Sequence, residues 1–425
     1  EKVSKEVLLK AIKLSLDPPV NIVNLDEVIF KKDPKTILPP QPRLEYVDCK
    51  LLDRKLGTNK ASELFLAIDQ IISLFPYTHY MKLRNGVSGL TKDIVELIMQ
   101  WKEKIEKSYR ILESLKSTDF KAEDSKKESV LLLVPSDRQL GIVKGNWTKW
   151  VWKERAYDGS IAPSAIGWLK DVKNISQVLK AEGVRSVVIV DRAIAHEASK
   201  DLEASRILEI DIPSDLAKIG YVRDQSVTWT SNPVICNMSL DIRRGEEWVI
   251  NEIYYELNKS PIIRIRWTKI NDKLFRASME GGNFFIIKTD EETVLMTGIG
   301  VRGSNYPTLR FLSNILPEDI RIIAIPIAGY VKDWHTGAVH LDVVFAYLGS
   351  LNGVRYALVD PSRMGFYAAL EYDRETNEFR IIELPLLMKE LGILIDEPPR
   401  IGVSPITMVN ALNLGNGKLI SDRYN

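Results

Sequence analysis

His340 and Asp342 are the pair of residues in this sequence whose types and spacing most directly suggest chemistry. They stand two positions apart, and the chain continues as an apolar run to Phe345. In a β-strand, residues i and i+2 point to the same face, so we expect both side chains to project into one cavity. A histidine transfers protons near neutral pH, and a neighbouring carboxylate binds a cation or orients the imidazole ring. The alternative interpretation is a polar pair at the end of a strand.

Other polar residues that are candidates for recognising a substrate precede His340 in the chain, in short stretches between predicted strands and helices. They are two carboxylates and three arginines: Asp224, Glu280, Arg243, Arg244 and Arg302. Carboxylates match the N–H edges of a planar guanidinium group, and arginines match a carboxylate at the other end of such a substrate. As alternatives, the carboxylates cap turns or form surface pairs, and the arginines belong to a solvated basic face.

A guanidinium substrate would also need a nucleophile. His340 beside the guanidinium carbon would protonate a departing amine and then activate water, while a thiolate suits the attack on that carbon best. The sequence contains two cysteines. We expect Cys236, in an apolar stretch, to be a buried structural residue, and Cys49 lies in a different part of the chain.

Repeated strand and helix signals after residue 126 must position these side chains. Units of roughly 50–60 residues follow the order strand, strand, helix, strand, which predicts an α/β ring of like modules around a central cavity. The predicted strands are Val130–Pro135, Ser186–Asp191, Val227–Met238, Ile262–Trp267, Asn283–Ile287, Thr293–Gly298, Arg321–Ile327, Leu341–Leu348, Val354–Val359, Met408–Leu412 and Lys418–Ser421. The predicted helices are Ile175–Glu182, Glu246–Leu257, Tyr306–Leu316 and Leu386–Leu391.

Residues 1–126 are expected to form a separate, mainly helical module of unknown role. Helical spacing of apolar residues predicts helices over Val7–Ser15, Ala61–Leu74 and Thr91–Leu115. Prolines between residues 38 and 42 exclude regular helix or inner strand there. The charged stretch Ser117–Glu128 predicts a linker, so we place the domain boundary between residues 126 and 127.

Composition excludes several classes of function. Lys and Arg number 58 against 57 Asp and Glu, so nothing in the charge predicts binding to nucleic acid or to a membrane surface. No apolar run reaches the roughly 20 residues of a membrane span, and the first residues do not resemble a signal peptide. Two cysteines suit a reducing cytoplasm, and many Ile, Lys and Glu residues are compatible with a thermophilic source. A homo-oligomer is compatible with these properties.

Four motifs, in this order, resemble the guanidino-group-modifying (pentein) superfamily, and arginine deiminase within it. They are Arg-Asp ending at Asp224, Glu-Gly-Gly beginning at Glu280, Gly-x-Arg-x-Ser around Arg302, and His-Leu-Asp-x-Val-Phe beginning at His340. The resemblance covers residues 130–425. It implies a five-bladed α/β propeller for residues 127–425 and an arginine-like small-molecule substrate, with no cofactor and no metal.

The resemblance also implies roles for the carboxylates and the histidine. Asp224 and Asp342 would grip the guanidinium nitrogens. Glu280 would handle protons together with His340, the general acid and base. These four residues are the catalytic candidates.

The substrate-binding candidates follow from the same resemblance. Arg243 and Arg302 would hold the carboxylate of the substrate, and Arg244 would share that role. Asn283 stands where the family usually has aspartate, and we assign it to substrate binding.

The nucleophilic cysteine of the family lies in a glycine-rich loop near the C-terminus, and we expect it after Asn425. The implied function is hydrolysis of the guanidino group of arginine or a related compound. Arginine dihydrolase and amidinotransferase activities are alternatives, because Asn283 stands where the family usually has aspartate. The usual helical insertion is missing between Asp191 and Asp224, so closure over the substrate must differ from that of the family. A non-catalytic guanidino-compound sensor or partner-binding protein is a further alternative, since neither cysteine of the sequence fits the nucleophile.

Overall fold

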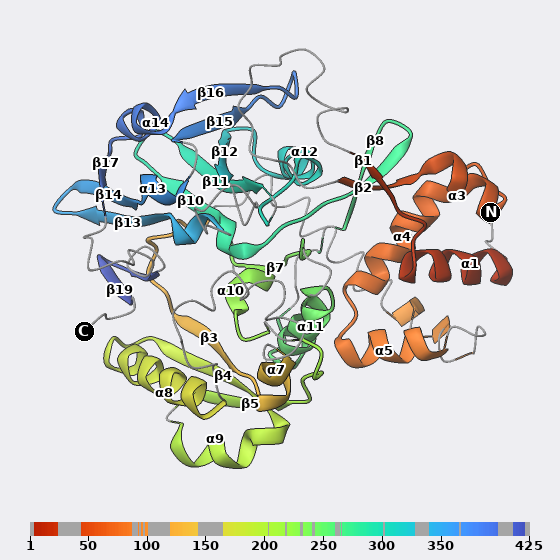
Figure 1. Cartoon of the computed structure of the whole chain (residues 1–425), viewed down its shortest axis with the longest axis horizontal. Coiled ribbons are helices and arrows are strands. Elements are labelled where there is room, and N and C mark those ends of the chain that lie inside the picture. Colours follow the sequence, from red (N-terminus) through yellow and green to blue (C-terminus); the bar gives the residue numbers. More distant parts are fainter. Residues whose placement is uncertain are drawn as a thin grey trace.

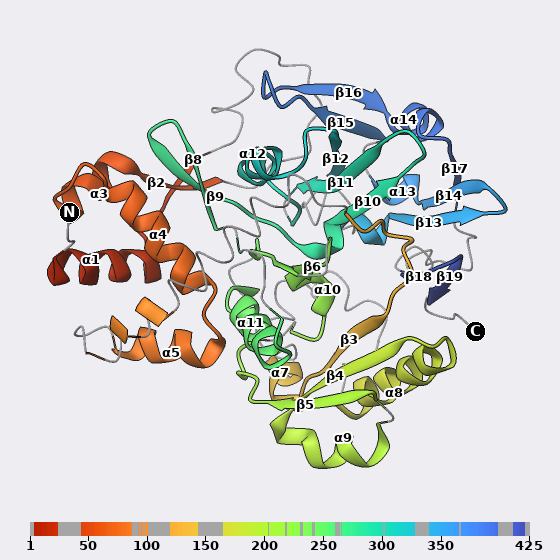
Figure 2. The ribbon, with the colours of Figure 1, turned by 180° about the vertical axis from the view of Figure 1, so that it is seen from behind.

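The computed structural model describes residues 4–23, 44–86, 92, 95–96, 98–100, 120–142, 165–202, 204–216, 219–229, 233–239, 243–259, 264, 266–300, 302–327, 340–364, 367–397 and 411–420. The N-terminal helices lie at one side of the molecule, and the sheets of the longer α/β part fill the other side (Figures 1 and 2). The predicted helix Thr91–Leu115 lies mostly outside the described residues, as do the prolines between 38 and 42.

Short polar side chains fix the start of the N-terminal helices. The hydroxyl of Ser4 accepts from the Val7 N–H at 3.2 Å, and the Asp48 carboxylate accepts from the Leu51 N–H at 3.1 Å. The helices are α1 (Lys5–Leu16), α3 (Cys49–Leu56), α4 (Ala61–Ser73) and α5 (Tyr77–Gly86). This confirms the two predicted helices that fall on described residues, with ends that differ by one or two positions.

The first part of the chain is joined to the rest by a shared sheet of order β1-β2-β9-β8. Its strands are β1 (Asn21–Val23), β2 (Leu44–Asp48), β8 (Trp267–Ile270) and β9 (Lys273–Arg276). Val47 of β2 pairs with Leu274 of β9, and both side chains are buried in a core that also holds Trp248 and Trp267. Main-chain hydrogen bonds and a common core therefore cross the predicted boundary at residue 126, so the first part is not a detached body.

The predicted linker after residue 116 also packs against the α/β part where the structure describes it. Phe120 and Ala122 are buried. The N–H of Lys121 donates to the Trp229 carbonyl at 2.7 Å, and that of Glu123 donates to the Ile286 carbonyl at 2.8 Å. The charged stretch predicted a linker. In the described residues 120–123, however, two side chains are buried and the two residues between and after them bond to the α/β part through their backbone.

A parallel three-stranded sheet of β3 (Ser129–Val134), β4 (Arg185–Asp191) and β5 (Arg206–Ile210) lies below α11 in the view of Figure 2. Alternate residues of β4 face different layers. Val188 and Val190 pack with α8 (Ala165–Ala181) and α9 (Ala195–Asp201), whereas Ile189 packs with α11 (Glu246–Glu256). Short helical segments also precede and follow these strands: α7 (Asp137–Ile142), a 3₁₀ turn (Arg192–Ile194) and α10 (Val222–Gln225).

The largest sheet has the order β10-β11-β12-β15-β16. The hairpin β10–β11 and the parallel strand β12 with its connecting helix α12 match the sequence-based prediction, while β15 and β16 were not predicted. The bounds are β10 (Phe284–Lys288), β11 (Thr293–Gly300), α12 (Tyr306–Ile315), β12 (Ile320–Ile327), β15 (Ala368–Tyr372) and β16 (Phe379–Glu383).

Three smaller sheets complete the described part. They are formed by β13 (Phe345–Leu351), β14 (Val354–Val359) and β17 (Ile393–Asp396); by β18 (Leu412–Gly415) and β19 (Lys418–Ile420); and by β6 (Ser226–Val227) and β7 (Val234–Ile235). Helices α13 (Pro361–Met364) and α14 (Leu384–Glu390) connect strands of this region. The architecture is α/β, and among the described strands no sheet closes on itself, so the five-bladed ring stays a prediction.

The segment of His340 to Asp342 corrects a prediction about local structure. It is not a strand: Leu341–Val343 form a 3₁₀ turn that follows His340, and β13 begins at Phe345. The apolar run therefore predicted the strand three to four residues too early. Within the described residues, no helix is long and apolar enough to cross a membrane.

The shared core predicts a large effect of a mutation in β9. We expect Leu274→Ala to lower the free energy of unfolding by about 2–5 kcal/mol, because it leaves a cavity between β2 and the rest of the chain. Leu386→Ala is the matched control, since Leu386 is 57% exposed on α14 and should cost less than about 0.5 kcal/mol. Urea denaturation followed by circular dichroism measures both. Equal, small effects would contradict the shared core.

Candidate active site

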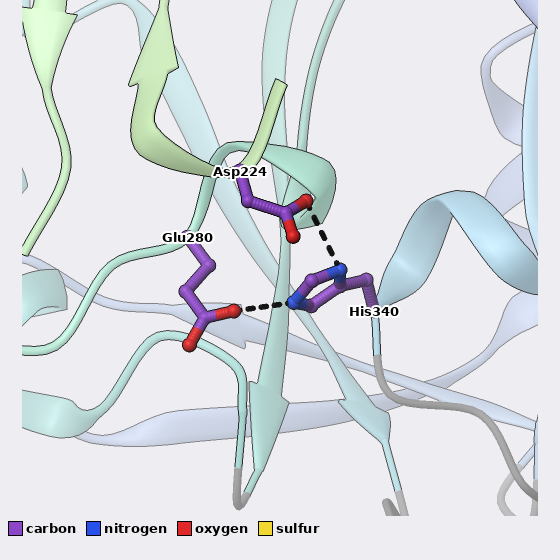
Figure 3. Close-up of side chains that lie close together, drawn as sticks. All are labelled: Asp224, Glu280 and His340. Carbon is purple, nitrogen blue, oxygen red and sulfur yellow. Dashed lines mark hydrogen bonds and ion pairs between the residues drawn. The ribbon is translucent and has the colours of Figure 1, made fainter. Parts of the chain in front are cut away.

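His340 lies between two carboxylates that come from distant parts of the chain (Figure 3). Its Nε2 is 2.5 Å from Oε2 of Glu280, and its Nδ1 is 3.4 Å from Oδ1 of Asp224. Asp224 is on the short helix α10, and Glu280 precedes a 3₁₀ turn, Gly281–Asn283. All three side chains are buried. The sequence-based candidates Asp224, Glu280 and His340 thus share one site.

Glu280 is held in the charged form by cations around it. It is fully buried, and its Oε2 accepts from Arg302 at 2.9 Å and lies 3.6 Å from Nη1 of Arg243. Its Oε1 accepts from the N–H of Ser239 at 3.2 Å and from the Ser239 hydroxyl. Burial alone would raise the pKa of Glu280, but Arg302, His340 and Arg243 hold it well below the ordinary value.

Arg243 is a fully buried guanidinium whose donors face carboxylates of the protein. Its Nε donates to both carboxylate oxygens of Glu246, at 3.0 and 3.2 Å, and its Nη1 lies 2.5 Å from Oδ2 of Asp224. Burial opposes the charge on Asp224, yet His340 and Arg243 keep the pKa of Asp224 below its ordinary value. In this arrangement Arg243 bonds to Asp224 and Glu246, so the carboxylate-binding role predicted for it requires it to exchange partners.

Arg244 points away from the His340 site. Its Nη2 donates to Glu45 of β2 at 2.9 Å. Consecutive arginines therefore serve different places, and the structure does not bring Arg244 together with the other predicted site residues. Nothing in the dipeptide Arg243-Arg244 distinguishes the two side chains.

Asp342 approaches the site from the other side of the glycine pair. Its Oδ2 is 3.3 Å from Nε of Arg223, which also lies 3.6 Å from Glu123 and stacks over the Phe285 ring at 5.3 Å. Burial raises the pKa of Asp342, and Arg223 and His340 offset part of that rise. Arg223 was not predicted as a site residue, although it is the arginine of the Arg-Asp motif.

The glycine pair after Glu280 leaves room for the site. A Cβ on Gly281 would lie 1.9 Å from the Arg223 carbonyl oxygen. A Cβ on Gly282 would lie 2.8 Å from Oδ2 of Asp342 and 3.0 Å from Nδ1 of His340. These distances show that Asp342 and His340 flank the same point, as predicted, although a turn rather than a strand places them there.

Asn283 joins the segments of the site through the backbone. Its Oδ1 accepts from the Leu341 N–H at 3.0 Å, and its Nδ2 donates to the Arg302 carbonyl at 3.0 Å. The side chain is fully buried. Its contacts position the His340 and Arg302 segments, while its predicted contact with substrate is not tested by this geometry.

The site carries more negative than positive side chains. Five carboxylates are in ion-pair contact with three arginines and His340: Asp224, Glu246, Glu280, Asp342 and Glu123 against Arg223, Arg243, Arg302 and His340. The excess of negative charge is costly in free energy, because a buried carboxylate without a cation is poorly stabilised. The arrangement therefore suits a cationic ligand with several N–H donors.

A metal ion is a second cation to consider. Among the described residues, Asp224, Glu280 and His340 offer ligand atoms that lie within 4.8 Å of one another. Both carboxylates of this cluster already contact guanidinium groups, Asp224 that of Arg243 and Glu280 those of Arg243 and Arg302, and the arginine charges disfavour a divalent ion there. We assign no metal to the site.

Neither cysteine of the sequence has the properties of a nucleophile. Cys236 is fully buried, and burial together with Glu280 and Asp224 raises the pKa of its thiol well above the ordinary value. Cys49 is buried at the start of α3, and burial raises its pKa as well. Cys236 thus lies near the carboxylates of the site, but it has a structural environment, as its apolar sequence context predicted.

The sequence profile of the arginine deiminase family matches residues 157–380, which is more than half of the chain. This span contains Asp224, Glu280, His340 and Asp342 and the arginines that pair with them, whereas Glu123, the further partner of Arg223, lies outside it. No curated protein matches the chain.

Several solved structures resemble the chain at low identity. DDAH from Pseudomonas aeruginosa, a cysteine-to-serine mutant with citrulline, is 15% identical with a TM-score of 0.34 over 64% of this chain and 92% of its own. An arginine dihydrolase of the cyanobacterial ornithine-ammonia cycle is 14% identical with a TM-score of 0.38 over 67% of this chain and 33% of its own. Agmatine deiminase from C. jejuni is 12% identical with a TM-score of 0.39 over 71% of this chain and 80% of its own.

The buried ion pairs give a pH-dependent prediction for Glu280→Gln. At pH 7 we expect the variant to be less stable by about 3–5 kcal/mol, because Arg302 and Arg243 lose a buried anion. A lowered carboxyl pKa stabilises the fold above the unfolded pKa of about 4.3, and this stability is lost as the pH falls through the folded value. The difference between wild type and variant should therefore shrink below about pH 4.

Denaturant unfolding at a series of pH values measures this difference. Glu378→Gln is the control, since Glu378 is exposed on the surface. A Glu280→Gln effect that is small at pH 7, or that does not change with pH, would show that Glu280 is not held as a buried anion.

Proposed function

Because the chain belongs to the arginine deiminase family, we propose that it is a hydrolase acting on the guanidino group of arginine or a related compound. The observation that carries this proposal is the meeting of Asp224, Glu280 and His340 in one buried site with Asp342 beside them. A family profile alone gives no such geometry, and a cluster of buried carboxylates alone gives no reaction. In this proposal the α/β part has the five-bladed pentein architecture.

Recognition of a guanidinium group follows from the charges of the site. The Asp342 carboxylate already pairs with the guanidinium group of Arg223, and the Asp224 carboxylate pairs with that of Arg243. Both carboxylates therefore have positions suited to planar N–H donors, and a substrate guanidinium between them would relieve the excess of negative charge. Arg302 and, after exchange of partners, Arg243 would hold the carboxylate of the substrate. Asn283 would support this pocket through the Arg302 and Leu341 backbones.

The reaction that we propose has two steps at the guanidinium carbon. A cysteine thiolate attacks this carbon, a C–S bond forms, and the C–N bond breaks as His340 gives a proton to the departing ammonia. Water, deprotonated by His340, then attacks the same carbon, so that a C–O bond forms and the C–S bond breaks, which releases citrulline. Glu280 at 2.5 Å stabilises the imidazolium form of His340 in both steps.

The nucleophile of this proposal is a cysteine thiolate, and the proposal assigns it to neither Cys236 nor Cys49. Cys236 and Cys49 are unsuited to the role because burial raises the pKa of each thiol. The same observation favours a second candidate function, a sensor that binds a guanidino compound without cleaving it. Arginine dihydrolase and amidinotransferase reactions are variants of the first proposal, since they begin with the same attack on the guanidinium carbon.

The remaining parts of the proposal concern the setting of the reaction. We propose a cytoplasmic protein that needs no cofactor and no metal, and whose ligand is a small guanidino compound. Among the described residues of the first 126, β2 and the shared core support the α/β part, and Glu123 lies 3.6 Å from Arg223 beside Asp342.

Turnover of arginine tests the enzyme proposal. We expect the full-length natural gene product to form citrulline or ornithine from arginine, and His340→Ala to lower kcat by about 10²–10⁴-fold through loss of proton transfer. His196→Ala, at an exposed position on α9, is the control and should keep full activity. Ammonia release and product chromatography measure the rates. Turnover that survives His340→Ala unchanged would refute the assignment.

Ligand binding separates the enzyme from the sensor. We expect arginine to raise the melting temperature of the protein, and Asp342→Asn to weaken arginine binding by about tenfold or more through loss of a charge-assisted hydrogen bond. Citrulline, which has a neutral urea group, should bind more weakly than arginine. Binding without turnover supports the sensor, and absence of binding by arginine and by related guanidino compounds rules out both candidates.

A further inference from the structure

A cavity of about 500 Å³ lies where the N-terminal helices meet the α/β part, and we call it the junction cavity. It is lined by residues of α5, of β2, of the start of α11 and of the hairpin β8–β9, among them Tyr80, Glu45, Trp248 and Arg276. Asp224, Glu280 and His340 do not line it. The junction cavity is therefore separate from the candidate active site.

Three arginines from the α/β part line the junction cavity: Arg244, Arg266 and Arg276. Glu45 is the carboxylate between two of them, with one oxygen 2.9 Å from Arg244 and the other 2.7 Å from Arg276. Arg266 bonds to Asp69 at 3.0 Å, and Asp69 is not among the lining residues. Glu45 and Asp69 thus pair with these three guanidinium groups, and the carboxylates of Asp17 and Asp215 also line the junction cavity.

Some of the buried donors of these arginines lack an acceptor. Arg266 is 6% exposed, and its Nε has no hydrogen-bond partner among the described residues; the same holds for Nε of Arg276. A buried N–H without an acceptor costs about 1–3 kcal/mol. Burial, together with the neighbouring charges of Arg244 and Arg266, lowers the pKa of Arg276, and the hydrogen bond from Arg276 to Glu45 offsets part of that change.

Aromatic and apolar side chains also line the junction cavity. The Trp248 ring stacks on Tyr80 at 3.9 Å, and the guanidinium of Arg264 lies 4.0 Å from the centre of the Trp248 ring. The Trp248 Nε1 donates to the Ile72 carbonyl at 3.1 Å, which fixes the ring. Leu16, Val20 and Met81 add apolar surface. A volume of about 500 Å³ is that of a site for an organic molecule rather than for a single ion.

We propose that the junction cavity binds a small organic anion that carries carboxylate or phosphate groups. The guanidinium groups of Arg244, Arg266 and Arg276 take the anionic groups, because a planar fork of N–H donors pairs with the oxygens of either group. The apolar wall around Trp248 contacts the rest of the ligand. Arg84, which is exposed on α5 at the cavity, adds a further positive charge.

Isothermal titration of the folded protein with citrate and with pyrophosphate tests this site. A titration with sodium chloride at equal ionic strength is the reference, and we expect it to show no saturable binding. We expect at least one of the two anions to bind saturably, and Arg276→Gln to weaken that binding by about 10–100-fold, as loss of a charge-assisted hydrogen bond predicts. Comparison of the two anions distinguishes a carboxylate ligand from a phosphate ligand.

Two further variants keep the test decisive. Arg84→Gln removes an exposed charge at the cavity without touching the buried pairs, so it should weaken binding even if Arg276→Gln fails to fold. Arg321→Gln is the matched control. Arg321 is a partly buried arginine on β12, and it pairs with Glu292, Glu371 and Glu390. It should leave anion binding unchanged. Absence of saturable binding, equal binding by Arg84→Gln and wild type, or equal weakening by Arg321→Gln would overturn the proposal.

Discussion

The buried ion pairs around Glu280 are the interaction on which the rest of the structure depends. Glu280 and Arg243 are both fully buried, and Arg302 is 4% exposed. Each of these charges would be costly alone, so the three segments that carry them must come together as the chain folds. His340 joins the same group through Glu280, which explains how a histidine from a short turn reaches a precise position.

This constraint also explains why the candidate catalytic residues lie on irregular segments. Asp224 is on a four-residue helix, Glu280 precedes a 3₁₀ turn, and His340 precedes another. The regular strands β10, β11 and β13 supply a rigid core behind these segments, and the turns give the side chains their direction. The two glycines after Glu280 allow this close approach of segments, because a Cβ there would collide with the Arg223 backbone or with Asp342.

The N-terminal part contacts the α/β part mainly through strand pairing and a shared apolar core. Strand β2 extends the hairpin β8–β9, and Trp248 at the start of α11 packs among N-terminal side chains. The backbone between Arg243 and Trp248 therefore has two neighbours: the His340 site on the Arg243 side and the junction cavity on the Arg244 side. A ligand in the cavity and a substrate in the active site would contact consecutive residues of one segment.

Local patterns in the sequence determined much of the secondary structure and the identity of the candidate site. Helical spacing of apolar residues identified α1 and α4, because burial on one face leaves a period in the local sequence. Continuous apolar runs identified β3 and β4, and two apolar stretches on either side of a polar turn identified the hairpin β10–β11. The order of short motifs identified Asp224, Glu280 and His340 as partners. Only the tertiary structure decided that Arg243 faces the site while Arg244 faces Glu45, since adjacent residues carry no pattern that separates them. It also decided that β2 pairs with β9 and that Arg276 meets Glu45, because pairing across more than two hundred residues depends on the packing of the whole chain and not on local preference.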